Sequence, residues 1–253
     1  MTIELQEERE HVPEQLTIGV LALQGAFHEH IAYLNRLRSK GHTIRAIAVR
    51  TKDELDQCYA LILPGGESTA ITRVAARTEG LLPALQAFVA DPNRPVYGTC
   101  AGMILMAEPD GVGGGKRQGD GKAWGGIRGM KVWRNLYGGQ LESFEYPLAI
   151  PSLFSLPDEP FNTIFIRAPC LHSLSPSARA ETEILASLPP ECIPAPPPAD
   201  SPLGPADEET LGAVMLRQGR KLVTSFHPEL SGDARIHEFW VERCVLGRDS
   251  TGG

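Results

Sequence analysis

Apolar positions fall into long uninterrupted blocks in the first half of the chain. The stretch 16–25, LTIGVLALQG, is almost continuously apolar, and shorter blocks of the same kind follow at 43–49, 59–66 and 95–100. Such blocks are typical of strands buried on both faces of a parallel sheet. The intervening stretch 26–41 has apolar residues at helical spacing and ends in glycine. This alternation predicts βαβ units, and therefore an α/β fold with a doubly wound, mostly parallel sheet flanked by helices.

The second half has a different pattern. Short strand candidates separated by turns occur at 126–135, 161–169, 181–188, 210–218 and 221–229. They predict an antiparallel extension of the sheet, because short connections suit antiparallel neighbours. The stretch 233–246, DARIHEFWVERCVL, predicts a closing amphipathic helix.

These patterns predict one domain over residues 16–247, preceded by a polar, mobile leader (1–15) and followed by a tail (248–253). Two segments are expected to be flexible insertions. The stretch 109–125 is rich in glycine but lacks the spacing of a phosphate-binding loop. The stretch 189–209 is rich in proline, so we expect it to be extended or disordered and to bury little apolar area.

Composition excludes several classes of function. The formal net charge of −7 argues against a nucleic-acid partner, which requires a basic surface. No apolar run is long enough to span a membrane. The five cysteines form no C-x-x-C pair, so neither a disulfide framework nor a metal site is expected. The acidic N-terminus has no apolar segment typical of a signal peptide, and we expect a cytoplasmic protein.

The first candidate for chemistry is Cys100, in the stretch 98–102, GTCAG. The pattern G-x-C-x-G is the thiol counterpart of the nucleophile elbow, in which a sharp strand-to-helix turn exposes the reactive side chain. A helix N-terminus beside the sulfur favours the thiolate. The alternative is that Cys100 is a small buried core residue.

Two further stretches supply the other groups that a cysteine nucleophile requires. In PGGEST (64–69), backbone N–H groups of a glycine turn are placed to face an oxyanion, although Glu67 and Ser68 also suit a helix cap. In SFHPE (225–229), His227 and Glu229 provide a base and an acid to orient it. The alternative for His227 is a surface histidine in a turn. The remaining histidines are interpreted as surface or capping residues: 11, 28, 30, 42, 172 and 237.

Six stretches in a fixed order indicate a known family. They are LALQGAFHEH, LILPGGEST, GTCAG, WRNLYGGQLESFE, FIRAP and SFHPE. Together they resemble the glutaminase subunit of pyridoxal 5'-phosphate synthase, a class I, triad-type glutamine amidotransferase. The resemblance covers about residues 16–246. GTCAG with HPE is typical of class I amidotransferases in general, whereas the other stretches narrow the resemblance to the vitamin B6 branch.

The resemblance implies a role for each matching residue. It implies a catalytic triad of Cys100 as nucleophile, His227 as base and Glu229 as orienting acid. The oxyanion hole would consist of the backbone N–H groups of Gly66 and Ala101. The implied glutamine contacts are Gly65, Gly66, Glu67, Arg134, Ile166 and Arg167. Gln24 would lie near the oxyanion region and the partner interface.

The implied reaction is hydrolysis of L-glutamine to L-glutamate and ammonia, with no cofactor. The ammonia would pass to a (β/α)₈-barrel synthase subunit, the implied partner in a hetero-oligomer. Two alternatives stay open: a glutaminase subunit serving another amidotransferase, and a non-catalytic regulatory protein on the same fold. The chain departs from the family pattern at Gly139, where many members have arginine, and at Cys170, where histidine is frequent. These departures affect partner contact or local packing, not the triad.

Overall fold

The computed structural model describes residues 12–115, 122–137, 143–153 and 159–248. A seven-stranded sheet forms its centre, in the order β10-β11-β12-β4-β3-β1-β2. Five of these strands are parallel: β12 (Lys221–Thr224), β4 (Val96–Thr99), β3 (Ala60–Leu63), β1 (Gln15–Leu21) and β2 (Thr43–Val49). Antiparallel β11 (Ala213–Gln218) and β10 (Thr182–Ser187) extend the sheet beyond β12. The predicted fold class is confirmed.

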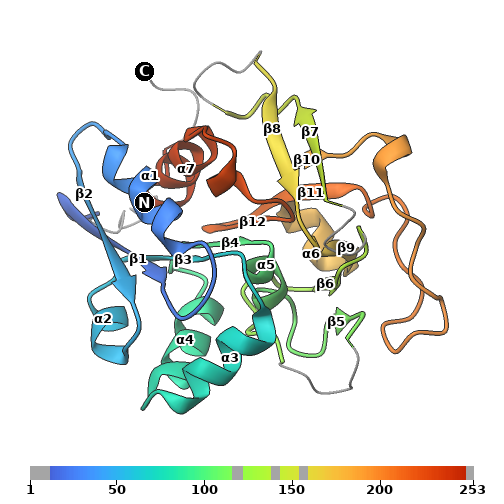
Figure 1. The fold of residues 1–253 in the computed structure, drawn as a ribbon, viewed down its shortest axis with the longest axis horizontal. Coiled ribbons are helices and arrows are strands. Elements are labelled where there is room, and N and C mark those ends of the chain that lie inside the picture. Colours follow the sequence, from blue (N-terminus) through green and yellow to red (C-terminus); the bar gives the residue numbers. More distant parts are fainter. Residues whose placement is uncertain (1–11, 116–121, 138–142, 154–158, 249–253) are drawn as a thin grey trace, which may run out of the picture.

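Helices cover both faces of the sheet (Figure 1). One face carries α2 (Lys52–Asp56), α3 (Ser68–Arg77), α4 (Leu81–Ala90) and α5 (Ala101–Leu105). The other face carries α1 (Phe27–Arg36) and α7 (Arg235–Trp240), which continues into the π-helical turn η4 (Val241–Val245). The central strands are therefore buried on both sides, which explains why their sequences are continuously apolar rather than alternating.

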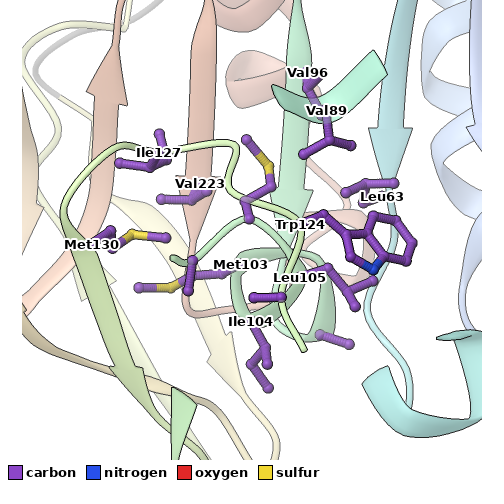
Figure 2. Close-up of a cluster of buried hydrophobic side chains, with 14 of the residues drawn as sticks. Leu63, Val89, Val96, Met103, Ile104, Leu105, Trp124, Ile127, Met130 and Val223 are labelled. Atoms are coloured by element: carbon purple, nitrogen blue, oxygen red, sulfur yellow. The ribbon is translucent and has the colours of Figure 1, made fainter. Parts of the chain in front are cut away.

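Alternate residues of the central strands enter two different cores. Leu61 and Leu63 of β3 belong to the core under α2–α5, whereas Ala60 and Ile62 belong to the core under α1 and α7. Figure 2 shows part of the first core, where Trp124 lies with Leu63 and Leu105. Trp124 comes from the glycine-rich stretch, and its backbone N–H donates to the Leu105 carbonyl. The described end of this stretch is therefore packed against the domain.

Smaller sheets lie beside the carboxyl end of β12. A three-stranded sheet consists of β5 (Val112–Gly113), β6 (Met130–Trp133) and β9 (Cys170–Leu174). A hairpin consists of β7 (Phe144–Leu148) and β8 (Phe161–Phe165). The remaining elements are α6 (Pro176–Glu181) and the 3-10 turns η2 (Pro190–Cys192) and η3 (Pro228–Leu230). Strands β5, β7 and β9 and helices α2, α4 and α6 were not among the elements predicted from the sequence.

Several predicted elements end earlier than their apolar pattern. Strand β1 stops at Leu21, because the chain must turn toward the loop after β3. There Gly25 has φ of +98°, and a Cβ at this position would lie 1.8 Å from the Gly65 carbonyl oxygen. Only glycine permits this approach of two loops. Helix α1 stops at Arg36 because Leu37 is extended, so Gly41 is not its terminator.

The proline-rich segment 189–209 begins with the 3-10 turn η2 and does not lie apart from the domain. Cys192, Ile193 and Ala206 pack against the core under α1 and α7. The Asp207 backbone N–H donates to the His172 carbonyl, at 2.9 Å. The expectation that the segment buries little apolar area is therefore wrong. Proline restricts the backbone without preventing the neighbouring apolar side chains from packing.

Within the described residues, no helix combines the length and the apolar character that a membrane span requires. The leader residues 1–11, Gly139 and residues 249–253 lie outside the described part of the chain.

Candidate active site

The candidate catalytic groups meet at the carboxyl ends of neighbouring parallel strands. Cys100 follows β4, His227 lies three residues beyond β12, and Gly65 lies two residues beyond β3. In the sheet, β4 stands between β12 and β3. Parallel strands present their carboxyl ends at one edge, so this order places Cys100 between the histidine and the glycine turn.

Cys100 has the backbone conformation of a nucleophile elbow. Its φ of 47° and ψ of −101° are sparsely populated for a residue with a side chain. Its N–H donates to the Thr224 carbonyl at 2.9 Å, and its carbonyl accepts from Ile104 N–H at 3.3 Å. These hydrogen bonds anchor the strained residue to β12 and to α5. Strain of this kind costs about 1–3 kcal/mol and persists where the surroundings over-determine the conformation.

The two glycines of GTCAG allow α5 to lie close to the sheet. A Cβ at Gly98 would lie 2.6 Å from the Gly102 carbonyl carbon, and one at Gly102 would lie 2.1 Å from the Leu63 oxygen. Both approaches are too close for any side chain. The motif therefore reflects packing of the turn against β3 and β4, which in turn fixes the direction of the Cys100 side chain.

His227 contacts both of its predicted partners. Its Nδ1 lies 2.8 Å from Glu229 Oε1, and Cys100 lies close enough to the imidazole to influence its charge. Burial would lower the pKa of His227, but the contacts with Cys100 and Glu229 outweigh it and raise this pKa to about 10. The imidazole is thus held ready to carry a proton beside the sulfur. His227, which is 9% exposed, is not a surface turn residue.

Cys100 differs chemically from the other buried cysteines. Burial raises the pKa of Cys58, Cys170 and Cys244 to about 12 in each case, so these thiols stay protonated. Cys100 instead lies beside the buried His227 imidazole. Cys170, one of the two departures from the family pattern, is fully buried and donates to the Leu211 carbonyl at 3.0 Å. Its effect is therefore on local packing.

The glycine turn lies against both the histidine and the loop after β1. A Cβ at Gly65 would lie 2.4 Å from His227 Cε1, and one at Gly66 would lie 2.4 Å from Gln24 Oε1. The same Gln24 oxygen accepts a hydrogen bond from the Glu67 backbone N–H at 2.6 Å. Gln24, which the sequence placed near the oxyanion region, is thus in direct contact with this turn.

The remaining predicted contacts lie around Cys100 to different extents. Ala101, at 1% exposure, is the first residue of α5, directly after the nucleophile. The Ile166 carbonyl lies 3.9 Å from Cys100 Sγ, and the exposed Arg167 follows it with a φ of 49°. Arg134 is half-buried in the turn after β6. Contacts of these residues with glutamine stay predictions.

Sequence reasoning misassigned three histidines. His30, His172 and His237 are fully buried rather than surface or capping residues. His30 Nε2 lies 3.5 Å from Glu229 Oε2. A signal for His30 was present in the sequence, because it shares a helical face with Tyr33 and Leu34, three and four residues on, which are buried too.

Comparisons with known proteins agree with this geometry. The model of the SNO glutamine amidotransferase family matches residues 20–196. A pyridoxal 5'-phosphate synthase subunit PdxT from Pseudarthrobacter chlorophenolicus is 39% identical, covering 98% of this chain and 99% of the relative. A PdxT subunit from Pelotomaculum thermopropionicum is 37% identical, covering 91% and 96%.

Among solved structures, one described as a glutamine amidotransferase is similar with a TM-score of 0.66 and 35% identity. The match covers 90% of this chain and 98% of that one. The family model spans more than half of the chain, and the relatives align along nearly all of it. The chain therefore belongs to the SNO glutamine amidotransferase family.

Proposed function

We propose that this protein is the glutaminase subunit of a pyridoxal 5'-phosphate synthase. It hydrolyses L-glutamine to L-glutamate and ammonia, and ammonia passes to a (β/α)₈-barrel synthase subunit. The observation that carries the proposal is the contact of a strained Cys100 with a buried His227–Glu229 pair. The names of the PdxT relatives support the choice of glutamine and of the synthase partner.

The proposed reaction starts with the Cys100 thiolate, which attacks the carboxamide carbon of glutamine. The resulting oxyanion is stabilised by the N–H groups of Gly66 and Ala101, which follow the carboxyl ends of the neighbouring strands β3 and β4. His227 then donates its proton to the departing ammonia, leaving a thioester on Cys100. Water, deprotonated by His227, hydrolyses the thioester and releases glutamate.

Glu229 keeps the imidazole in the orientation that this proton transfer needs. With Glu229 accepting from Nδ1, the other ring nitrogen of His227 faces the sulfur. The intact set of Cys100, His227 and Glu229 disfavours the alternative of a non-catalytic regulatory protein.

The experiment that tests the proposal is glutamate release, measured with and without the barrel subunit. We expect the wild type to release glutamate and Cys100→Ala to release none, since the alanine methyl group cannot attack the carboxamide. Cys192→Ala is the matched control, because Cys192 is half-buried in the proline-rich segment. Equal glutamate release by wild type and Cys100→Ala would refute the proposed chemistry.

A separate comparison tests the partner. Synthesis of pyridoxal phosphate from glutamine by the mixture should require Cys100, whereas synthesis from added ammonium salt should not. A glutaminase that leaves the barrel subunit dependent on added ammonium would instead favour the alternative of another amidotransferase.

A further inference from the structure

Behind the triad, two buried histidines continue the line of polar groups into the core. His30 Nε2 lies 3.5 Å from Glu229 Oε2, on the side of the carboxylate that His227 does not use. On its other side, His30 Nδ1 lies 2.8 Å from His237 Nε2. Both histidines have no exposed surface, and the Glu229 side chain is equally buried. The line runs from the end of β4 through η3 and α1 to α7.

Hydrogen-bond satisfaction decides which nitrogens carry protons. Glu229 Oε2 and His30 Nε2 are both buried, lie 3.5 Å apart, and have no standard hydrogen-bond partner in the described residues. A carboxylate oxygen can only accept, so a proton on His30 Nε2 satisfies both atoms. His30 Nδ1 is then an acceptor, and His237 Nε2 must donate to it. His237 Nδ1 therefore carries no proton. This is consistent with the structure, in which His237 Nδ1 has no hydrogen-bond partner among the described residues.

Both histidines stay neutral in this environment. Burial is the largest cause and lowers the pKa of His30 well below its usual value and that of His237 to about 3. His237 adds to the effect on His30, and so does His227. The Asp233 carboxylate opposes it at His237, without overcoming burial.

In the described part of the chain, the aromatic rings that face the two histidines belong to uncharged tyrosines. Tyr97 of β4 meets His30 edge-on, with ring centroids 6.4 Å apart. Tyr33 of α1 stacks on His237, with ring centroids 4.7 Å apart. A neutral pair can donate to Glu229 without competing with His227 for the catalytic proton.

We propose that His30 and His237 are positioning residues of the glutaminase site: His30 donates its Nε2–H to Glu229, and His237 fixes His30 in that tautomer. The inference rests on the proposed function. Glu229 then accepts one hydrogen bond on each oxygen, which fixes its orientation toward His227. The separation of 3.5 Å is long for a hydrogen bond, and such contacts in resting sites often shorten when substrate binds. His237 acts through His30 and does not touch the reacting atoms.

The tautomers can be read directly from nitrogen chemical shifts of the full-length protein labelled with ¹⁵N-histidine. We expect His30 and His237 to be neutral, with the proton on Nε2 in both, at pH 7. Assignment uses the loss of each signal in the His30→Gln and His237→Asn variants. A proton on His30 Nδ1, or a cationic His30, overturns the proposal. This measurement is made on the wild-type protein and does not require glutamine.

Activity of variants gives a second, independent test. His30→Leu removes the donor, and His30→Gln keeps an N–H at a similar distance from the backbone. We expect His30→Leu to lower kcat/KM for glutamine about 10- to 100-fold with little change in KM, since a hydrogen bond to a buried charge is lost. The alkaline limb of the pH profile should move down, because a less firmly held Glu229 raises the pKa of His227 less than it does in the wild type. His30→Gln should recover most of the loss.

The matched control is Ile236→Val, which removes one buried methyl group from α7 beside His237. A purely structural role predicts that His30→Leu and Ile236→Val lower the melting temperature and leave the alkaline limb in place. That result, or a His30→Gln variant as poor as His30→Leu, overturns the proposal. The same variants can be compared without glutamine, by measuring how the rate of Cys100 alkylation by iodoacetamide depends on pH. A shifted alkylation profile in a protein without glutaminase activity would refute the proposed function and leave the positioning role standing.

Discussion

At the scale of single residues, the site depends on one strained cysteine and one cationic imidazole. The G-x-C-x-G turn fixes Cys100 at a positive φ, and the His227–Glu229 contact keeps a proton beside the sulfur. The three buried cysteines with raised pKa values have no such partner among the described residues. Position in the fold, not the presence of a thiol, therefore distinguishes Cys100, the proposed nucleophile, from these cysteines.

Replacing the base should harm catalysis more than replacing the acid that orients it. His227→Asn removes the group that transfers the proton, and general acid–base catalysis contributes about 10²–10⁴-fold. Glu229→Gln keeps a hydrogen-bond acceptor and should leave at least about tenfold more activity. Steady-state glutamate release, with circular dichroism to confirm folding, measures both. The assignment of roles is wrong if Glu229→Gln is the more damaging change.

Gly25 should control the position of the glycine turn after β3, which is the proposed oxyanion site. The Gly65 carbonyl accepts a hydrogen bond from Ala26 N–H at 3.3 Å, so the Gly66 N–H of the same planar peptide points the opposite way. A Cβ at Gly25 would displace this carbonyl. We expect Gly25→Ala to lower kcat by about 10²–10³-fold, the usual effect of losing one oxyanion donor.

Gly41→Ala is the control for this change. Gly41 also has a positive φ, of +79°, but a Cβ there would meet nothing within 4 Å. The Gly41→Ala substitution therefore imposes the same kind of backbone strain at a position away from the site. Similar glutaminase activity in the two variants would show that the Gly25–Gly65 approach does not position the oxyanion peptide.

At the scale of elements, the carboxyl ends of β3, β4 and β12 and the hairpin β7–β8 converge on one place. The hairpin is fixed there by the His227 N–H, which donates to the Ile164 carbonyl of β8 at 2.9 Å. The proline-rich segment behaves as a further packed element. Its Ile193 lies so close to Gly212 that a Cβ on that glycine would be 2.7 Å from the isoleucine Cδ1.

This packing predicts a measurable contribution of the segment to stability. Ile193→Ala should lower the free energy of unfolding by about 1–2 kcal/mol, less than for a fully buried isoleucine, because the side chain is half-buried. Glu191→Ala, an exposed neighbour, should change it by no more than about 0.5 kcal/mol. Urea unfolding of both variants measures the difference. Equal midpoints would mean that the segment does not stabilise the domain.

At the scale of the whole molecule, buried neutral histidines should make the fold sensitive to acid. The pKa of His237 is about 3 in the folded state, against about 6.5 when unfolded. Between these values the unfolded chain binds a proton that the folded chain does not, so stability falls as pH falls. The slope is about 1.4 kcal/mol per pH unit for one such group. His227 has the opposite sign: its contribution is complete below about pH 6.5 and is lost as pH rises through about 10.

The acid effect can be isolated by His237→Phe, which keeps an aromatic ring against Tyr33 and removes the titrating group. Unfolding free energies measured between about pH 7 and pH 4 should decline less steeply for this variant than for the wild type. Parallel profiles would show that His237 takes up its proton without opposing the fold.

The α/β class, the parallel core with its antiparallel extension, and the strand ends that carry Cys100 and His227 could all be predicted from the sequence. These features are local, because a fully buried strand must be apolar and an elbow must have small neighbours. The sequence also contained the family motifs, on which the implied roles of Gly66, Arg134 and Arg167 rest. Periodicity and spacing alone would have left Arg134 and Arg167 without a role.

Only the tertiary structure decided which groups surround Glu229 and which loops are packed. His30 and His237 are 207 residues apart, and nothing in the local pattern of either indicates that their rings are in contact. Composition likewise predicted an unpacked proline-rich segment, whereas the distant core offered Ile193 a place to bury. Local sequence fixes backbone preference and amphipathic pattern. Contacts between distant elements depend on how the whole sheet is arranged. Here the sheet brings α1, α7 and η3 to the same face, and this arrangement places the two neutral imidazoles of His30 and His237 beside Glu229.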